Sequence, residues 1–345
     1  MKKLFFYILF SIICLPIFSQ IGNSIFGFLN LPSSARMAAL GGTNVSLYDH
    51  DLNFVFHNPA LRSSKSDKII DISISNYLAD ITFGTGIYAF SKGENMFSVG
   101  MQYVDYGKFD GRDEYDIQTG IFSARDMALY LSYARQVNKH LTLGGTLKPL
   151  CSVFETYTSV GAAIDAGLLY SDSASQFSAG FTIRNIGTQF KGYYSDEDGQ
   201  HYEALPWNIE LGISKKLAHA PFRFSLTLHN LQQWNLNYIS TVEKQKINLN
   251  DTKTDDKPSF VDMAFRHAII GVEFVPNNSF YVAASYNHRR MQEMAMDGFK
   301  TTSGFSFGAG VKLYRFRLGF ALSQFQVGNF SYMFSVSSDL NDFGL

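Results

Sequence analysis

From residue 68 onward, large apolar side chains alternate with small or polar ones. In the stretch 97–103, for example, Phe, Val, Met and Tyr are separated by Ser, Gly and Gln. A period of two places the apolar residues on one face of an extended strand and the small residues on the other. The pattern recurs and predicts fourteen strands, at residues 68–76, 81–91, 95–106, 125–137, 140–151, 158–170, 176–186, 206–217, 221–230, 266–275, 279–288, 303–312, 314–324 and 328–337.

The links between these predicted strands differ in length in a regular way. The links after the second, fourth, sixth, eighth, tenth and twelfth strands are tight, the fifth is of medium length, and the first and thirteenth are short. Outer-membrane barrels have such an asymmetry, with short periplasmic turns at one end and longer extracellular loops at the other. The long links, which we expect to be extracellular loops, are 107–124, 187–205, 231–265 and 289–302.

Charged side chains in the strand middles share the face of the small residues. The opposite face is nearly free of charge, as a bilayer requires, because an Arg or Lys facing lipid near the midplane costs about 2–4 kcal/mol. We therefore predict an all-β transmembrane outer-membrane barrel of antiparallel strands with a polar lumen. A soluble barrel or sandwich would instead bury the aromatic face, but a barrel of this size encloses more space than inward aromatic side chains fill. The predicted lumenal charges are Asp71, Lys148, Asp165, Arg184, Glu210, Arg223, Glu273, Lys312, Arg315 and Arg317.

The segment 34–62 reads unlike the rest of the chain. It holds an Ala-rich run around Arg36, then Gly41-Gly42, and later Asn58-Pro59-Ala60. We expect this segment to form a small helix and to enter the mouth of the barrel, where Arg36 pairs with one of the lumenal acids. The predicted division of the chain is 1–20 signal peptide, 21–67 N-terminal plug, 68–338 barrel and 339–345 polar tail, with both termini periplasmic.

The first twenty residues have the pattern of a secretory signal peptide. A basic start is followed by an apolar run at 4–18 and a small-residue exit at Ser19, and this run is too short for a permanent membrane anchor. We expect cleavage near Ser19 and export to the outer membrane. Cleavage removes Cys14 and leaves Cys151 alone, so neither an intramolecular disulfide nor a cysteine metal cluster is expected.

Composition adds two constraints. The chain contains 32 Phe, 19 Tyr and 28 Gly, a mixture that suits apolar residues spread singly along strands. Its formal charge is -1, and the loss of two lysines with the signal peptide gives -1 - 2 = -3, so we expect no nucleic-acid partner. Aromatic side chains near strand ends are predicted to form interfacial girdles, namely Tyr77, Tyr103, Tyr106, Tyr133, Tyr170, Trp207 and Tyr286.

No motif for catalysis stands out, and we expect a protein that is not an enzyme, with no cofactor and no metal. The eight His are scattered without metal-binding spacing, and the Gly residues are dispersed along strands rather than gathered in a phosphate-binding loop. Asp49-His50-Asp51 could form a metal or acid–base cluster, but we interpret it as a solvated turn. The acidic stretches 113–116 and 195–198 lack the spacing of a calcium loop and are interpreted as solvated surface.

Residues 28–42 read FLNLPSSARMAALGG and are followed by Asn53 and by Asn58-Pro59-Ala60. This segment resembles the N-terminal region of the PorV/PorQ family of outer-membrane proteins from the type IX secretion system of Bacteroidetes, and it looks closer to the PorQ branch. Motif identity is limited to residues 28–61, and Arg36, Gly41, Gly42, Asn58 and Pro59 carry it.

The resemblance implies a FadL-related barrel of fourteen strands with an N-terminal plug. It also implies a non-enzymatic role in the cell-surface attachment complex, where PorQ-like proteins hold PorZ at the outer membrane beside PorU and PorV. The extracellular loops would be the docking surface, assisted by outer-membrane lipid or lipopolysaccharide. The rival function is a FadL-like transporter of hydrophobic small molecules, which should have an apolar pocket beside the plug and a lateral or lumenal exit. Fold alone does not choose between the two.

Overall fold

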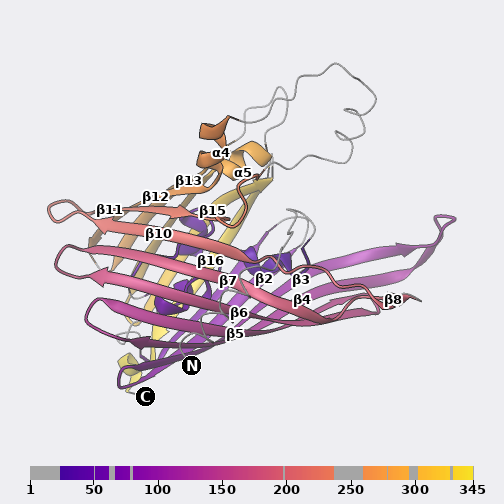
Figure 1. Ribbon diagram of the computed structural model, residues 1–345, viewed down its shortest axis with the longest axis horizontal. Helices are drawn as coiled ribbons and strands as arrows, with labels where there is room; N and C mark the ends of the chain where they lie inside the picture. Colours follow the sequence, from indigo (N-terminus) through magenta and orange to yellow (C-terminus); the bar gives the residue numbers. More distant parts are fainter. Residues whose placement is uncertain are drawn as a thin grey trace, which may run out of the picture.

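The computed structural model describes residues 24–49, 51–61, 67–77, 81–196, 199–236, 259–277, 279–294, 302–326 and 329–344. Fourteen antiparallel strands of this described part close into one barrel, as the alternation predicts (Figure 1). The barrel strands are β1 Ile69–Asn76, β2 Thr82–Lys92, β3 Asn95–Arg112, β4 Gln118–Gln136, β5 Leu141–Phe154, β6 Tyr157–Asp172, β7 Phe177–Lys191, β10 Asn208–Lys216, β11 Phe222–Leu228, β12 Ala268–Asn277, β13 Phe280–Asn287, β14 Phe305–Leu313, β15 Phe316–Gln326 and β16 Asn329–Asp339.

Each barrel strand pairs with its neighbour in the chain, and β1 pairs with β16 to close the sheet. That closing pair runs in unbroken register from Ile69 opposite Asp339 to Asn76 opposite Tyr332. The step from β7 to β10 skips only β8 (Ser195–Asp196) and β9 (Gly199–Gln200), which form a separate small hairpin. Closure gives each strand a partner on both sides and removes the open edges that an open sheet would present.

The outer face of the barrel is apolar and exposed. On β1, Ile72 and Ile74 are 58 % and 55 % exposed, whereas Ser73 between them is 2 % exposed and faces inward. Phe307 and Phe334 repeat this pattern on β14 and β16, at 53 % and 55 % exposed. An uninterrupted apolar belt of this extent would be unfavourable in water and matches the hydrocarbon core of a bilayer. Among the residues described, no helix is long and apolar enough to cross a membrane.

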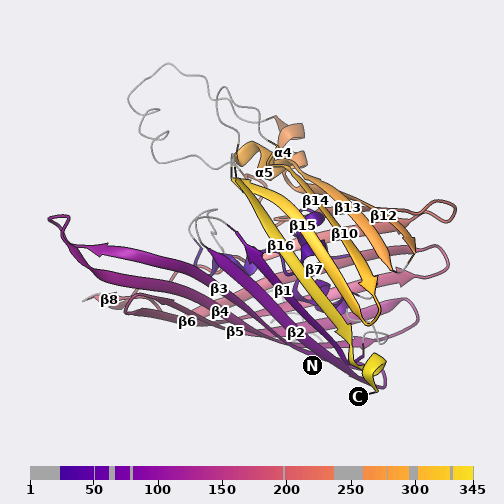
Figure 2. The same cartoon turned by 180° about the vertical axis from the view of Figure 1, so that it is seen from behind.

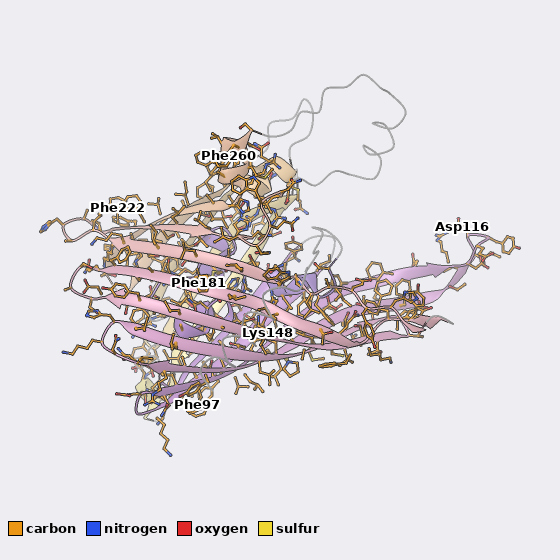
Figure 3. All side chains as sticks on the ribbon, in the orientation of Figure 1. Phe97, Asp116, Lys148, Phe181, Phe222 and Phe260 are labelled. Atoms are coloured by element: carbon orange, nitrogen blue, oxygen red, sulfur yellow. The ribbon has the colours of Figure 1, made fainter. Side chains whose placement is uncertain are left out.

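The barrel rim is uneven because β3 and β4 continue far beyond their neighbours. The two views show them as a long hairpin (Figures 1 and 2), and Asp116 lies at its tip (Figure 3). The prediction that 107–124 is a loop is therefore wrong for most of its length: β3 reaches Arg112 and β4 begins at Gln118. The mixture of Gly and charged residues in 107–112 hides the alternation, and a register shift after Asp105 breaks its phase.

Two short helices cover the rim where the long links lie. Helix α4 (Phe260–Arg266) lies at the end of the predicted long link 231–265, and helix α5 (His288–Glu293) lies at the start of the predicted long link 289–302. The two helices pack beside each other above β12 and β13 (Figures 1 and 2). At the opposite end, the predicted polar tail begins with a 3-10 helix, η4 (Leu340–Phe343). The predicted signal peptide lies outside the described residues.

Residues 24–61 occupy the barrel interior, where they are drawn in indigo (Figure 1). Their elements are η1 Gly27–Asn30, α2 Ala35–Ala39, η2 Leu52–Phe56 and η3 Pro59–Leu61. We call residues 24–61 the plug. Its apolar side chains make a core against inward-facing wall residues, and the ring of Phe56 lies 4.6 Å from that of Tyr130 on β4 in an edge-to-face contact. The interior is therefore filled by the plug rather than by wall side chains alone.

Candidate functional site: the plugged lumen

The plug folds through local capping. Ser34 caps α2 by accepting a hydrogen bond from the Met37 amide at 3.2 Å, and Asp51 caps η2 by accepting from the Asn53 amide at 3.1 Å. Helix α2 ends at Ala39, and Gly41-Gly42 follow shortly after it with φ angles of 93° and 103°, which favour glycine. These two glycines, part of the predicted family motif, turn the chain back across the lumen.

Glycines of the wall let the plug come close. A Cβ on Gly144 would lie 2.5 Å from the Pro59 backbone, and one on Gly180 would overlap the carbonyl oxygen of Val45. Asn58 fixes the same region, because its amide nitrogen donates to the Val45 carbonyl at 2.8 Å and its oxygen accepts from the Ala60 amide at 3.0 Å. The motif Asn58-Pro59-Ala60 is therefore a packing element between plug and wall.

One group of charges joins the plug to β11 and β12. Arg36 places its Nε 2.8 Å from Glu273 and its Nη2 2.7 Å from Asp49, and Arg223 contacts the same two acids at 3.2 and 2.9 Å. The Arg36 guanidinium also lies 4.8 Å from the ring centre of Tyr281. We call these residues the Arg36 cluster. The predicted pairing of Arg36 with a lumenal acid is present, and Glu273 is that acid.

The same cluster corrects our interpretation of Asp49-His50-Asp51. Asp49 is no solvated turn residue, because it bridges two arginines, and Asp51 lies 4.0 Å from Arg36 with its side chain 17 % exposed. Burial alone would raise the pKa of Asp49, but the Arg36 and Arg223 guanidinium groups hold it well below its ordinary value. Nothing in the local sequence showed these long-range partners. His50 lies outside the described residues.

A second group joins the plug to β7 and β10. Arg184 places its Nη1 3.3 Å from Glu210 and donates through Nη2 to the Leu29 carbonyl at 3.0 Å. His57 and Thr43 complete the Arg184 cluster: the Thr43 hydroxyl donates to Glu210 at 3.1 Å, and His57 Nδ1 lies 3.0 Å from Arg184 Nη1. Burial and the neighbouring Arg184 charge lower the pKa of His57, so its Nδ1 accepts a hydrogen bond.

The remaining predicted lumenal charges divide into three groups. Lys148 and Asp165 form a buried pair at 2.5 Å on β5 and β6. Asp71, Lys312 and Arg317 line the cavity at the short-turn end of the barrel. Arg315 is not lumenal: it lies in the turn between β14 and β15, and its guanidinium is 4.7 Å from the ring centre of Phe343 in η4. The alternation failed there because the strand ends before it.

The predicted aromatic girdle is also only partly correct. Tyr133 and Tyr170 are 42 % and 41 % exposed on the outer face. Tyr106 instead donates a hydrogen bond inward to Asp126 at 2.6 Å, and Tyr77 packs against the core. Trp207 lines a cavity beside the plug. Strand ends tilt and twist, so parity alone does not fix the direction of their side chains.

Two cavities adjoin the plug, one at each end of the barrel. The cavity at the short-turn end measures about 490 Å³, and Arg36, Asp49, Arg223 and Tyr281 of the Arg36 cluster line it together with Lys312 and Arg317. The cavity at the long-loop end measures about 400 Å³, and its lining mixes arginine, amide and histidine side chains with apolar ones such as Leu31 and Ile269. Charged side chains in both linings distinguish these cavities from the apolar pocket expected for a hydrocarbon transporter. In the described part of the chain, no group of three or more His, Cys, Asp or Glu is placed to hold a metal.

An apolar groove runs over β1 to β4. It measures about 970 Å³ and is lined mostly by apolar side chains, among them Ile72, Met101 and Ile121. The groove lies where β2 begins, with Thr82 opposite Asp105, and where β3 continues beyond β2 paired with β4 alone. It has a larger volume and a more apolar lining than either cavity beside the plug.

The chain was compared with known proteins. No protein-family model and no curated protein sequence matches it. The solved structure of the toluene transporter TodX from Pseudomonas putida matches with a TM-score of 0.56 at 13 % identity, over 90 % of this chain and 99 % of that one. The CymD monoaromatic hydrocarbon channel matches at 0.54 and 11 %, over 90 % and 98 %, and a Pseudomonas aeruginosa FadL homologue at 0.50 and 11 %, over 89 % and 98 %. The chain therefore has the fold of FadL-like outer-membrane barrels.

Proposed function

We propose that this protein is a plugged outer-membrane barrel that acts as a docking scaffold, holding a partner such as PorZ, with PorU and a PorV-like protein, through its long-loop end. The observation that carries the proposal is the set of charged side chains in the mixed polar and apolar lining of the cavities beside the plug. Among the described residues, both cavities present charged and amide side chains. An apolar solute that entered would displace water from these side chains and offer them no hydrogen bonds in its place.

The long-loop end has the exposed apolar surface that a docking site needs. On and beside α4, Phe260, Val261 and Trp234 are 74 %, 61 % and 52 % exposed, and Figure 3 shows Phe260 at the upper edge of the view. At the tip of the β3–β4 hairpin, Tyr115 and Ile117 are 83 % and 62 % exposed. Exposed aromatic clusters of this kind mark interaction sites. We assign this end to the cell exterior and both termini to the periplasm, after removal of the signal peptide.

The sequence resemblance supports the same role. The residues that resemble the PorV/PorQ family, 28–61, belong to the plug that closes the barrel. Two buried charge clusters hold the plug against the barrel wall, and in this proposal the outer rim is the working surface. Outer-membrane lipid or lipopolysaccharide around the apolar belt would assist docking.

The second candidate is a FadL-like transporter of hydrophobic small molecules. The structural comparisons favour it over the scaffold, since the matched proteins are named as a toluene transporter and a monoaromatic hydrocarbon channel. The apolar groove over β1 to β4 would be its exit toward lipid. At 11–13 % identity these matches concern the fold and not the cargo.

Substitution on α4 separates the two functions. Phe260→Asp combined with Phe265→Asp places two charges on the exposed face of the helix and should reduce co-purification of the attachment partner from intact outer membranes by at least about tenfold. Tyr314→Asp, at an equally exposed site (80 %) at the opposite end, is the matched control and should have no effect.

The opposite outcome supports the transporter. In that case, the purified barrel carries hydrophobic small molecules and no protein partner, proteoliposomes containing it take up toluene, and the α4 substitutions leave both properties unchanged.

A further inference from the structure

The cavity between the plug and the long-loop end, which we call the loop-end cavity, has the dimensions of a small-molecule site. Its volume of about 400 Å³ lies within the range of about 300–1,000 Å³ that is typical of ligand pockets. Its floor includes the Gly41-Gly42 turn of the plug, and its wall comes from the ends of β7, β10 and β11 and from α5. Plug and wall therefore build it together.

The lining of the loop-end cavity carries excess positive charge. Arg184, Arg289 and Arg290 line it, whereas Glu210 is its one acid among the described lining residues and pairs with Arg184. Glu293, just outside the lining, pairs with Arg289, so the excess is 3 - 2 = +1. Arg290 is held in place by donating to the Gly41 carbonyl at 2.9 Å, and burial lowers its pKa to about 10, so it stays charged at neutral pH. Such a surface attracts an anion.

Three lining side chains also have buried polar atoms without a hydrogen-bond partner in the described structure: Arg184 Nε, Trp207 Nε1 and His229 Nε2. An unsatisfied buried polar atom costs about 1–3 kcal/mol. Burial lowers the pKa of His229 to about 4, so the ring is neutral, and with Nδ1 donating to the Asn230 side chain at 2.9 Å its Nε2 is an acceptor. These three atoms are buried behind the cavity surface, which itself presents arginine side chains, the ring of Trp207 and the side-chain amides of Asn230 and Gln233.

We propose that the loop-end cavity binds a small acidic sugar, a ring with several hydroxyl groups and one carboxylate. The carboxylate suits the arginines, whose guanidinium groups bind it in a bidentate manner. Hydroxyl groups can both donate and accept, so they suit the side-chain amides of Asn230 and Gln233. The Trp207 indole offers an apolar ring face on which a sugar ring can pack. A hydrocarbon offers no hydrogen-bond partner to the arginine and amide groups of this cavity.

Binding is measured by calorimetry on the purified full-length barrel in detergent, with D-glucuronate and D-glucose as probes at constant ionic strength. Glucuronate should bind at least about tenfold more tightly than glucose, because the arginine contacts are charge-assisted. Arg289→Gln should weaken glucuronate binding by about tenfold or more without changing glucose binding. Trp207→Ala, which removes the ring face, should weaken both sugars by about threefold or more.

The matched control is Arg266→Gln. Arg266 also sits on a short helix and pairs with an acid four residues away, Asp262 at 2.8 Å, as Arg289 pairs with Glu293 at 2.7 Å, but it does not line the cavity. Absence of glucuronate binding, equal affinity for glucose, or equal weakening by Arg266→Gln would overturn the proposal. None of these results bears on the scaffold function, because the test of that function changes residues of α4 and not of this cavity.

Discussion

Arg36 joins residues that lie far apart in the sequence. It lies on a short helix of small residues, yet it contacts Glu273 more than two hundred positions away and bridges to Arg223 through shared acids. Such a cluster balances opposite charges inside a closed space, so the loss of one member leaves the others unpaired.

Arg36→Met should therefore destabilise the folded barrel by about 3–5 kcal/mol, because Asp49 and Glu273 lose their main partner while they stay buried. Urea unfolding of the purified barrel in detergent, followed by its heat-modifiable gel mobility, measures the change. Arg112→Met is the control: Arg112 pairs with Asp116 on the surface, its side chain is 52 % exposed, and its loss should cost less than about 1 kcal/mol. Equal effects of the two substitutions would contradict the role given to the Arg36 cluster.

Asp51 makes the stability of the plug depend on pH. Burial raises its pKa from 3.8 to about 6, with Arg36 opposing and Asp49 adding to the shift. The folded chain thus binds a proton between pH 4 and 6 that the unfolded chain does not, so stability falls as the pH rises through this window. Each pKa unit corresponds to about 1.4 kcal/mol, which sets an upper limit of about 3 kcal/mol, and partial exposure of the side chain reduces it.

The measurement compares wild type with Asp51→Asn by thermal unfolding at pH 4.5 and pH 7. The wild type should lose more stability than the variant on going to pH 7. Asp49 does not interfere, because its lowered pKa moves its own contribution below pH 4. Parallel pH profiles for the two proteins would rule out Asp51 as the titrating group.

At the scale of elements, the closest contact between plug and wall is backbone against backbone. Gly180 on β7 faces the Val45 carbonyl with no room for a Cβ. Gly180→Ala should cost about 1–3 kcal/mol, since either the plug or the strand must shift. Gly86→Ala on β2, where a Cβ would meet nothing within 4 Å, should change stability by less than about 1 kcal/mol. Urea unfolding measures the free energy of unfolding of both variants. A larger loss for Gly86→Ala than for Gly180→Ala would contradict the close packing of Val45 against β7.

The strands were predictable because their signal is local. The alternation from Ile69 to Asp339 follows from which face meets lipid, and each strand shows it within a few residues. The β3–β4 extension was missed since both faces of a projecting hairpin meet water, and neither then needs to be apolar. The contacts of Arg36, Asp49 and His57 were not predictable in detail, because their partners come from distant strands that only closure of the barrel brings together.

At the scale of the whole molecule, three surfaces have different tasks. The apolar belt fits a bilayer, the polar interior holds the plug, and the long-loop rim exposes aromatic residues (Figures 1 and 3). The comparisons establish the FadL-like fold. The function of that fold in this chain depends on the chemistry of the rim and the lumen. In the scaffold proposal, partner binding depends on the exposed residues of the rim.

Site-specific photocrosslinking in intact cells tests this central claim most directly. A photoreactive side chain at Tyr115 or Phe260, which are 83 % and 74 % exposed at the long-loop end, should crosslink to a large secreted attachment protein. The same side chain at Tyr314, 80 % exposed at the short-turn end, should not. Crosslinks to lipid alone from Tyr115 and Phe260, or equal crosslinking to that protein from Tyr314, would contradict the account.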